Sequence, residues 1–468
     1  MVGTIARKEL VELLRDGRFR ALALVVLVLS AASFAAGWKQ YVDVQRQHGE
    51  AQQETRAQWL KQPAKNPHSA AHYGVYAFKP KSRLSLVDTG IDPYVGVAAW
   101  LEAHKQNEFR YRPAQDRPPI QRFGELTAAE SFLVILPLFI VLASFTAFAG
   151  EREQGTLRQL LSLGVRRREL VSGKAVGVAA ALALVIVPAT VFGVVALAFT
   201  SDFAGLREDF SRATLLILAY LAYFAIFVAV SLGVSASVRS SRTALVILLA
   251  FWFANSLIVT RAAADLASWL HPSPSAVAFQ RAMEKDLSNP DEMRVRLERR
   301  RQELMRQHNV TSMDAVPINF SGISLQEGEE HGNEVFDRHY GRVFETYEAQ
   351  NRTVRWAGIA APMLPMRVVS MALAGTDFAH HRDFVTAAES YRRHIQRVMN
   401  GDIAQNAKPG VVYTAGGSLW SQVPEFTYRL PDTGWALRSA AVSFLLLLGW
   451  FGAAVWFTSR ATRRLAAD

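Results

Sequence analysis

The chain has 468 residues, of which 50% are hydrophobic and only 20% are charged, which excludes an ordinary water-soluble protein. Its net charge of +11 comes from basic residues that flank apolar segments, so a nucleic-acid-binding protein is also excluded. The absence of cysteine excludes disulfides, thiol chemistry and Cys-based metal sites.

Residues 1–20 predict an amphipathic cytoplasmic helix at the membrane surface. One arc of the helical projection of IARKELVELLRDGRFR is apolar and the other is charged. The apolar arc comprises Ala6, Leu10, Leu13, Leu14 and Gly17, and the charged arc includes Lys8 and Glu9. A helix of this kind lies in the interface plane before the chain enters the bilayer.

Six apolar segments have the length and purity of membrane spans. They are residues 21–38, 127–149, 175–200, 213–238, 243–259 and 435–458. At about 1.5 Å of rise per residue, roughly 18 to 26 residues cross the ~30 Å hydrocarbon layer. The sequence therefore predicts an all-α polytopic membrane protein with six transmembrane helices.

The distribution of Lys and Arg predicts the orientation of the spans. Basic segments precede the first span, join the second to the third and the fourth to the fifth, and form the tail 459–468. Six spans put all four segments on one side, which the positive-inside rule assigns to the cytoplasm. We therefore expect a multi-pass protein of the cell (inner) membrane with both termini cytoplasmic and with residues 39–126 and 260–434 outside.

A short charged loop, residues 150–174, joins the second and third spans. Leu157, Leu160 and Leu161 recur at i, i+3 and i+4, which places them on one face of a short helix. We expect Thr156 to be the N-cap of this helix, after Gly155, and Gly164 to end it.

Two acidic residues, Glu151 and Glu153, stand at the mouth of the second span. Carboxylates there would repel anionic lipid headgroups, whereas Arg166 to Arg168 would be attracted to them. Spacing alone leaves two alternatives of equal weight, a helix that lies on lipid and a helix that docks into a groove of a partner protein.

The pattern E-R-E-Q-G-T-L-x-x-L-L-S from Glu151, followed by R-x-E-L-x-x-G-K ending at Lys174, resembles the loop after the second span in type-2 permeases of ATP-binding-cassette (ABC) transporters. The resemblance implies a coupling helix that contacts an ATPase subunit through Glu151, Glu153, Gly155, Thr156, Leu157, Leu160 and Leu161. The N-terminal helix is similar to the elbow helix of the same family, with Leu10, Leu13 and Leu14 on its apolar side. The long segment before the last span resembles a subgroup with an extended, uncharacterised exterior domain.

The resemblance implies the permease subunit of an ATP-driven exporter, working as a homodimer with two copies of a separate ATPase chain. The nearest approach to a P-loop, VSGKAV, lacks the first Gly and the Ser or Thr, so we expect no cofactor on this chain and ATP with Mg²⁺ on the ATPase. We also expect no enzymatic activity of the chain itself. Two alternatives remain: a complex that transmits force to a periplasmic partner without transport, and a membrane-anchored receptor or metal-binding protein without an ATPase.

Three residues inside the predicted spans are candidates for a role in gating or in packing between helices. Pro137 and Pro188 interrupt their spans and serve either packing or the hinges of a gate. Asn255, near the outer end of the fifth span, is expected to bond across a helix interface, with a dimer seam as one candidate.

The large exterior domain is predicted to be mainly helical. Its expected helices are Pro290–Gln307, Glu334–Gln350 and a third that reaches about Met399 with Asp383 as N-cap. In the first exterior segment, HYGVYAFKPKSRLSL predicts an extended arm or a strand pair that packs against this domain.

The apolar stretch Ala357–Ala374 is not expected to cross the membrane, because Arg367 lies in its middle and Pro362 and Pro365 interrupt it. We expect an interfacial or re-entrant segment, with a buried core helix of the exterior domain as the alternative.

All eleven histidines lie in the predicted exterior segments. The metal candidates are His331, His339, His380 and His381, each close to carboxylates, although a polar surface explains them better. His68 and His72 have the i, i+4 spacing of a ligand pair, but Pro67 adjoins them and no helical pattern surrounds them. No metal site is therefore predicted.

Overall fold

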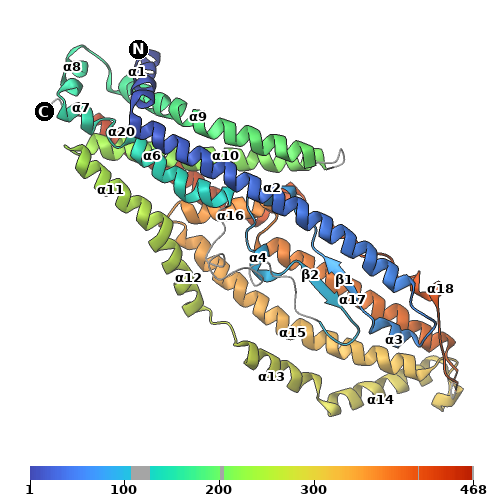
Figure 1. Cartoon of the computed structure of the whole chain (residues 1–468). Helices are drawn as coiled ribbons and strands as arrows, with labels where there is room; N and C mark the ends of the chain where they lie inside the picture. Colours follow the sequence, from blue (N-terminus) through green and yellow to red (C-terminus); the bar gives the residue numbers. More distant parts are fainter. Residues whose placement is uncertain (107–126, 201–204, 409–410, 466–468) are drawn as a thin grey trace.

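The computed structural model describes residues 1–106, 127–200, 205–408 and 411–465. Within these ranges the protein is elongated and almost wholly helical, with a single two-stranded sheet (Figure 1). Both termini lie at the end of the molecule that carries α7 (Ala149–Glu153) and α8 (Thr156–Ser162), and α14 (Pro290–Gln307) lies at the other end. The predicted all-α architecture is confirmed.

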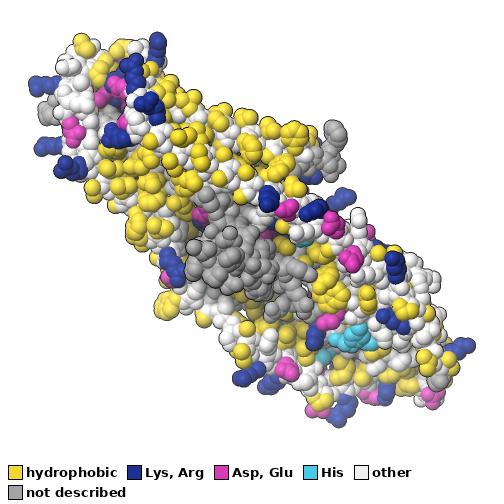
Figure 2. Space-filling model, in the orientation of Figure 1, with side chains coloured by type: hydrophobic (Ala, Val, Ile, Leu, Met, Phe, Trp, Pro, Cys, Tyr) yellow, Lys and Arg dark blue, Asp and Glu magenta, His cyan; other side chains and the backbone are white. Residues whose placement is uncertain are grey.

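Six helical segments of the described chain are long and apolar enough to cross a membrane, which confirms the predicted number. They are α2 (Gly17–Leu60), α5 to α7 (Ala128–Glu153), α9 (Arg167–Thr200), α10 (Leu206–Ser237), α11 to α12 (Ser241–Leu270) and α20 (Ala441–Arg463). Figure 2 shows hydrophobic side chains over this bundle, with Lys and Arg gathered at the end that carries the termini. This distribution suits a bundle with lipid around its middle.

The first of these segments, α2, is a single helix of 44 residues. The side chain of Asp16 caps its start, because Oδ1 accepts a hydrogen bond from the backbone N–H of Arg18 at 2.8 Å. The helix reaches Leu60, well beyond residue 38, where the predicted first span ends. At its far end Trp59 is buried and donates from Nε1 to the carbonyl of Trp420 at 2.9 Å.

Two of the segments contain a π-helical turn. The second consists of α5 (Ala128–Glu130), the π turn Ser131–Ile135, α6 (Leu136–Ser144) and α7, and the fifth of α11 (Ser241–Phe253), the π turn Ala254–Ile258 and α12 (Val259–Leu270). Pro137 has no N–H to offer the carbonyl of Leu133, four residues earlier. The hydroxyl of Tyr223 donates to that carbonyl instead, at 3.0 Å. A side chain of α10 therefore supplies the hydrogen bond that Pro137 cannot, and the choice between packing and a hinge at Pro137 stays a prediction.

The centre of the bundle is α10, which packs against α6, α9, α20 and α16 (Met363–Ala374). Its buried aromatic residues Tyr220, Tyr223, Phe224 and Phe227 belong to the main apolar core. The opposite side of α10 stays exposed, with Leu218 57% and Leu221 45% exposed, as suits a helix that packs on one face.

The stretch Ala357–Ala374 supplies α16, whose apolar residues are almost completely buried. Its neighbours are α10, α20, α15 and α19, so the helix is buried, as the alternative held, and the interfacial or re-entrant placement stays a prediction. The Oγ of Ser370 and the Oη of Tyr220 lie 3.0 Å apart. Arg367 makes an ion pair with Glu130 at 2.6 Å, which explains how the charge is accommodated there.

The remaining elements form what we call the distal domain. They are α3 (Pro67–Ala71), β1 (Val75–Phe78), a 3-10 turn (Arg83–Leu86), α4 (Asp92–Val95), β2 (Ala98–Leu101), α13 (Ala276–Leu287), α14, a 3-10 turn (Met313–Ala315), α15 (Phe320–Ala357), α17 (Phe378–Asn406) and α18 (Gly417–Trp420). The short α19 (Thr433–Ser439) leads into α20, and α1 (Val2–Arg15) opens the chain. β1 and β2 pair antiparallel and pack with α17. Of the two strands only β1 lies in the stretch predicted to form an extended arm or a strand pair, and β2 lies beyond it.

The predicted bounds and N-caps of the helices in the distal domain are correct in some cases and wrong in others. The bounds of α14 agree with the prediction, and α15 is much longer than the expected Glu334–Gln350. The N-cap of α17 is Asp377, whose side chain accepts from the N–H of His380 at 3.0 Å. The prediction of Asp383 is wrong: this residue lies inside the helix and accepts from the hydroxyl of Tyr428 at 2.7 Å.

Candidate functional site

The loop of residues 150–174 contains α7, α8 and the start of α9. Gly155, with φ +75°, turns the chain between α7 and α8, and Gly164, with φ +81°, follows α8. Both conformations favour glycine because they lie in the left-handed region. Gly155 is the N-cap and Thr156 is the first helical residue, so the predicted N-cap is one residue off; the Thr156 hydroxyl donates to the Glu151 carbonyl at 3.2 Å.

The leucine face of α8 packs against the protein's own bundle. Leu157 is 2% exposed and lies in an apolar cluster with Phe148, Leu170 and Leu232, and Leu160 and Leu161 are partly buried against the same cluster. The helical face predicted from their spacing is therefore present. Its side chains point inward, and a docking role for them stays a prediction.

The outward face of α8 is mostly polar. Arg158, Gln159 and Ser162 are exposed, and Leu163 directly after the helix is 78% exposed. A largely exposed leucine beside polar groups resembles the apolar anchor of a small docking surface. We call these four residues the outward face.

Four charged residues from α1, α7 and α9 form a cluster. Glu151 Oε1 lies 2.8 Å from Lys8 Nζ of α1 and 2.9 Å from Lys174 Nζ of α9, and Lys174 Nζ also lies 2.9 Å from Glu9 Oε2. The Lys174 side chain is 1% exposed, and those of Glu9 and Glu151 are 9% and 10% exposed. This charged cluster joins the N-terminal helix, the loop and the third span.

The environment of the charged cluster shifts two of its pKa values. Burial raises the pKa of Glu9 above its usual range, although Lys174 opposes the rise. Burial lowers the pKa of Lys8, but the hydrogen bonds and charges of Glu151 and Glu12 outweigh it, so that the pKa of Lys8 is raised.

The N-terminal helix α1 lies on α9 rather than only on a membrane surface. A Cβ on Gly173 or Gly177 would lie 2.6 Å from a side-chain atom of Ile5 or Glu9, so these glycines permit the close approach. Glu9 is 7% exposed, which contradicts its predicted place on a solvated charged arc. Leu10 and Leu13 pack against the bundle, and Leu14 is 37% exposed.

The loop is also fixed to the turn between α10 and α11. Glu153 accepts hydrogen bonds from the N–H and the hydroxyl of Ser241 at 2.9 and 2.7 Å, at the start of α11. Arg152 donates to the carbonyls of Val238 and Ala236 at the end of α10. Ser235 Oγ accepts from the N–H groups of Phe148 and Ala149. The negative charge of Glu153 at the start of α11 and the positive charge of Arg152 at the end of α10 both interact favourably with the dipole of the helix that they meet.

The other predicted membrane residues have distinct positions. Asn255 is 2% exposed; its Oδ1 accepts from the Met363 N–H at 3.0 Å and its Nδ2 lies 3.3 Å from the Tyr223 hydroxyl. It thus bonds across helix interfaces within one chain, and its place at a dimer seam stays a prediction. Pro188 lies inside α9 with an exposed side chain.

The four predicted metal candidates do not come together. His339 Nε2 contacts Asp286 Oδ2 at 2.8 Å, His380 Nδ1 contacts Asp377, and His331 and His381 are buried on α15 and α17. In the described part of the chain, the histidines that do converge are His68, His72 and His104. His104 stands 32 residues beyond His72, so sequence spacing did not group them.

Comparison with known families divides the chain into two matches. A family model described as ABC-2 family transporter protein matches residues 3–307, about two thirds of the chain, including α1 and the 150–174 loop. A second model, described as a domain of unknown function (DUF3526), matches residues 276–429, which cover most of the distal domain. No curated protein matches the chain.

Proposed function

Because the chain belongs to the ABC-2 transporter protein family and is a membrane permease component of an ABC transporter, we propose that α8 is the element by which an ATPase subunit drives the spans. In this proposal the outward face of α8 lies in the cytoplasm and docks on the ATPase. ATP and Mg²⁺ are bound by the ATPase, and this chain binds no cofactor.

The observation that supports the proposal is the number of spans tied to the loop around α8. Leu157 seats α8 in a cluster that includes Leu232 of α10 and Leu170 of α9. Glu153 and Arg152 hold the α10–α11 turn, and the charged cluster holds α1 and α9. A displacement of α8 would therefore be shared by α9, α10 and α11, as a rocking motion of the spans requires.

The complete assembly in this proposal is a homodimer of permeases with two ATPase copies in the inner membrane, and its direction is export. Both termini lie at the α8 end of the bundle and are then cytoplasmic (Figure 1). The four basic segments at that end fit the positive-inside rule. The distal domain then lies in the periplasm.

Co-purification of the ATPase tests the docking surface. Leu163→Ser and Arg158→Glu alter exposed side chains, so they leave the packing of α8 intact while they remove an anchor and reverse a charge. We expect each to reduce the ATPase recovered per permease by about tenfold, the effect of losing one central interface residue. The matched control is Val412→Ser in the distal domain, where the side chain is 90% exposed. Equal recovery from all three variants would contradict the proposal.

A second candidate function is force transmission to a periplasmic partner without transport. The distal domain favours it, because α2 runs from the bundle into that domain without a break and α16 ties the bundle to α15 and α19. Vesicles that contain the permease and its ATPase distinguish the two functions. ATP turnover without movement of any candidate solute supports force transmission, and solute accumulation supports transport.

A further inference from the structure

Three histidines meet on the surface of the distal domain, where Figure 2 shows a patch of histidine side chains. The pairing of β1 with β2 explains why. Val75 is the register partner of Leu101, so the residues before β1 and the residues after β2 leave the same end of the hairpin. His72 stands three residues before Val75 and His104 three residues after Leu101. His68 lies one helical turn before His72, on α3.

The three imidazole rings lie close together, with their planes tilted or edge-on to one another. Their centroids are 4.9 Å apart for His68 and His72, 4.8 Å for His68 and His104, and 4.5 Å for His72 and His104. The Nε2 atoms of His68 and His104 are 3.1 Å apart. With metal–nitrogen bonds of about 2.0–2.1 Å, two imidazole nitrogens on one tetrahedral Zn²⁺ lie about 3.4 Å apart. The spacing of the His68–His104 pair is therefore close to that of a metal site, and the ligand nitrogens of all three histidines lie within 4.8 Å of one another.

The other nitrogen of two of these rings is already held by a buried acceptor. His104 Nδ1 lies 2.6 Å from Glu329 Oε1, and a carboxylate can only accept, so this nitrogen carries the proton. His68 Nδ1 lies 3.1 Å from the Oδ1 of Asn400, whose Nδ2 donates to Gln326. Both Nε2 atoms then turn a lone pair toward the same point. Two neutral rings in this arrangement repel each other, so either a proton shared between the Nε2 atoms or a metal ion must hold them together.

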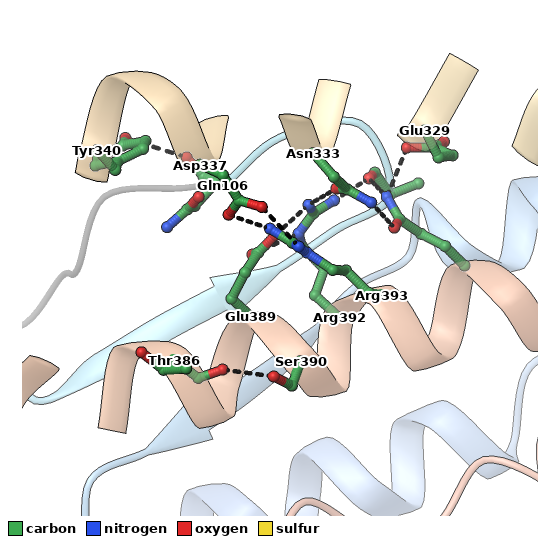
Figure 3. A network of polar contacts seen from close by, with 12 residues as sticks. Gln106, Glu329, Asn333, Asp337, Tyr340, Thr386, Glu389, Ser390, Arg392 and Arg393 are labelled. Atoms are coloured by element: carbon green, nitrogen blue, oxygen red, sulfur yellow. Dashed lines mark hydrogen bonds and ion pairs between the residues drawn. The ribbon is translucent and has the colours of Figure 1, made fainter. Parts of the chain in front are cut away.

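Buried hydrogen bonds hold Glu329 and the residue before His104 in place. Glu329 is 3% exposed, and its Oε2 accepts from Gln396 Nε2 at 2.6 Å. The carbonyl of Ala103, directly before His104, accepts from Arg392 and Gln396 of α17. Figure 3 shows this network between α15 and α17, with Arg392 also bound to Glu389 and Asn333. A carboxylate that orients a histidine through Nδ1 is the usual outer partner of a metal-bound imidazole.

We propose that His68, His72 and His104 bind one divalent first-row transition metal ion, with Zn²⁺ the species that suits three imidazoles best. His68 and His104 ligate through Nε2, and Glu329 and Asn400 are positioning residues. His72 and His104 are exposed, so a fourth coordination position is open to water or to an exchangeable ligand. The ion joins the segment around α3 to the residues that follow β2, and Glu329 and Asn400 connect two of its ligands to α15 and α17. This site is independent of the docking of an ATPase on α8.

Metal binding by the purified full chain in detergent tests the proposal. After removal of metal with EDTA and titration with Zn²⁺, we expect one ion per chain in calorimetry and in elemental analysis. His72→Ala and His104→Ala should each weaken binding at least 100-fold. Glu329→Gln should weaken it about 10- to 100-fold while one ion still binds, as for other outer partners of metal ligands. The control is His308→Ala, which removes an exposed histidine of the distal domain far from α3 in the chain.

Two further measurements keep the result unambiguous. Melting of the metal-free variants shows whether they fold, and His72→Ala should melt like the wild type because His72 is exposed. Co²⁺ in place of Zn²⁺ should give the visible absorption of a low-symmetry nitrogen site in the wild type and not in His104→Ala. A wild type that binds no ion at 100-fold molar excess of Zn²⁺, or histidine variants that bind as the wild type does, would overturn the proposal.

Discussion

Replacement of Lys174 by methionine tests how strongly the charged cluster holds α1 to α9. Lys174 is 1% exposed and makes ion pairs of 2.9 Å with both Glu9 and Glu151. In the variant, Glu151 keeps Lys8, but Glu9 remains buried without its cation. Breaking a buried pair by removal of one partner costs about 3–5 kcal/mol of unfolding free energy, because the remaining charge is uncompensated.

Two further variants isolate this effect. Lys174→Met combined with Glu9→Gln removes the unpaired charge and should recover most of the lost stability, as double-mutant coupling in a contacting pair predicts. Lys8→Met removes a cation whose side chain is 43% exposed, so its cost should stay below about 1 kcal/mol. The assay is tryptophan fluorescence of the purified protein as a denaturing detergent is added to mixed micelles. Equal losses from Lys174→Met and Lys8→Met would refute this account of the cluster.

The pH dependence of the Lys174→Met variant gives an independent check. Burial raises the pKa of Glu9 and Lys174 opposes that rise, so the variant should have a still higher Glu9 pKa. A carboxyl whose folded pKa exceeds its unfolded pKa takes up protons on folding, and its contribution to stability falls as the pH rises. The deficit of the variant should therefore shrink as the pH is lowered.

Two glycines of α2 form a matched pair. Gly37→Ala should destabilise the protein by about 1–3 kcal/mol, because the new Cβ would lie 2.2 Å from the Leu86 carbonyl oxygen. Gly49→Ala meets no atom within 4 Å and should stabilise the protein by about 0.5–1 kcal/mol, because alanine suits a helix interior better than glycine. The same unfolding assay checks both, and a Gly37→Ala variant as stable as Gly49→Ala would contradict the contact. Asn255→Ala should lower the free energy of unfolding by about 1–3 kcal/mol, because it leaves the buried N–H of Met363 without an acceptor. The loss should appear as a lower detergent midpoint of unfolding. An unchanged midpoint would show that this N–H finds another acceptor.

The sequence predicted those features that depend on local pattern. Apolar length alone located six spans, and Pro290 marked the start of α14 because proline suits a first helical position. The N-caps of helices were harder to predict from the sequence, since more than one nearby residue could cap the same helix. Asp377 rather than Asp383 caps α17, and Gly155 rather than Thr156 precedes α8, because tertiary contacts decide which turn begins the helix.

Features that depend on distant contacts could not be predicted from periodicity. The spacing of Leu157, Leu160 and Leu161 defined a helical face but not the direction in which it points. Glu9 looked solvated because the residues that bury it, Gly177 and Lys174, belong to another helix. The histidine group needed the strand register, and the signal was present: one histidine precedes the first predicted strand, and another follows an equally short apolar run at residues 98–101.

The uninterrupted course of α2 has a mechanical consequence. Its 44 residues make a rod about 66 Å long at 1.5 Å per residue, roughly twice the thickness of the hydrocarbon layer. If the rod pivots within that layer, about 45 Å of it lies beyond the fulcrum, so a tilt of about 5° swings its tip by about 4 Å. Trp59, which packs against Trp420 at that tip, would carry the swing into the far end of the molecule, and α2 would then act as a lever that amplifies small angular changes in the bundle.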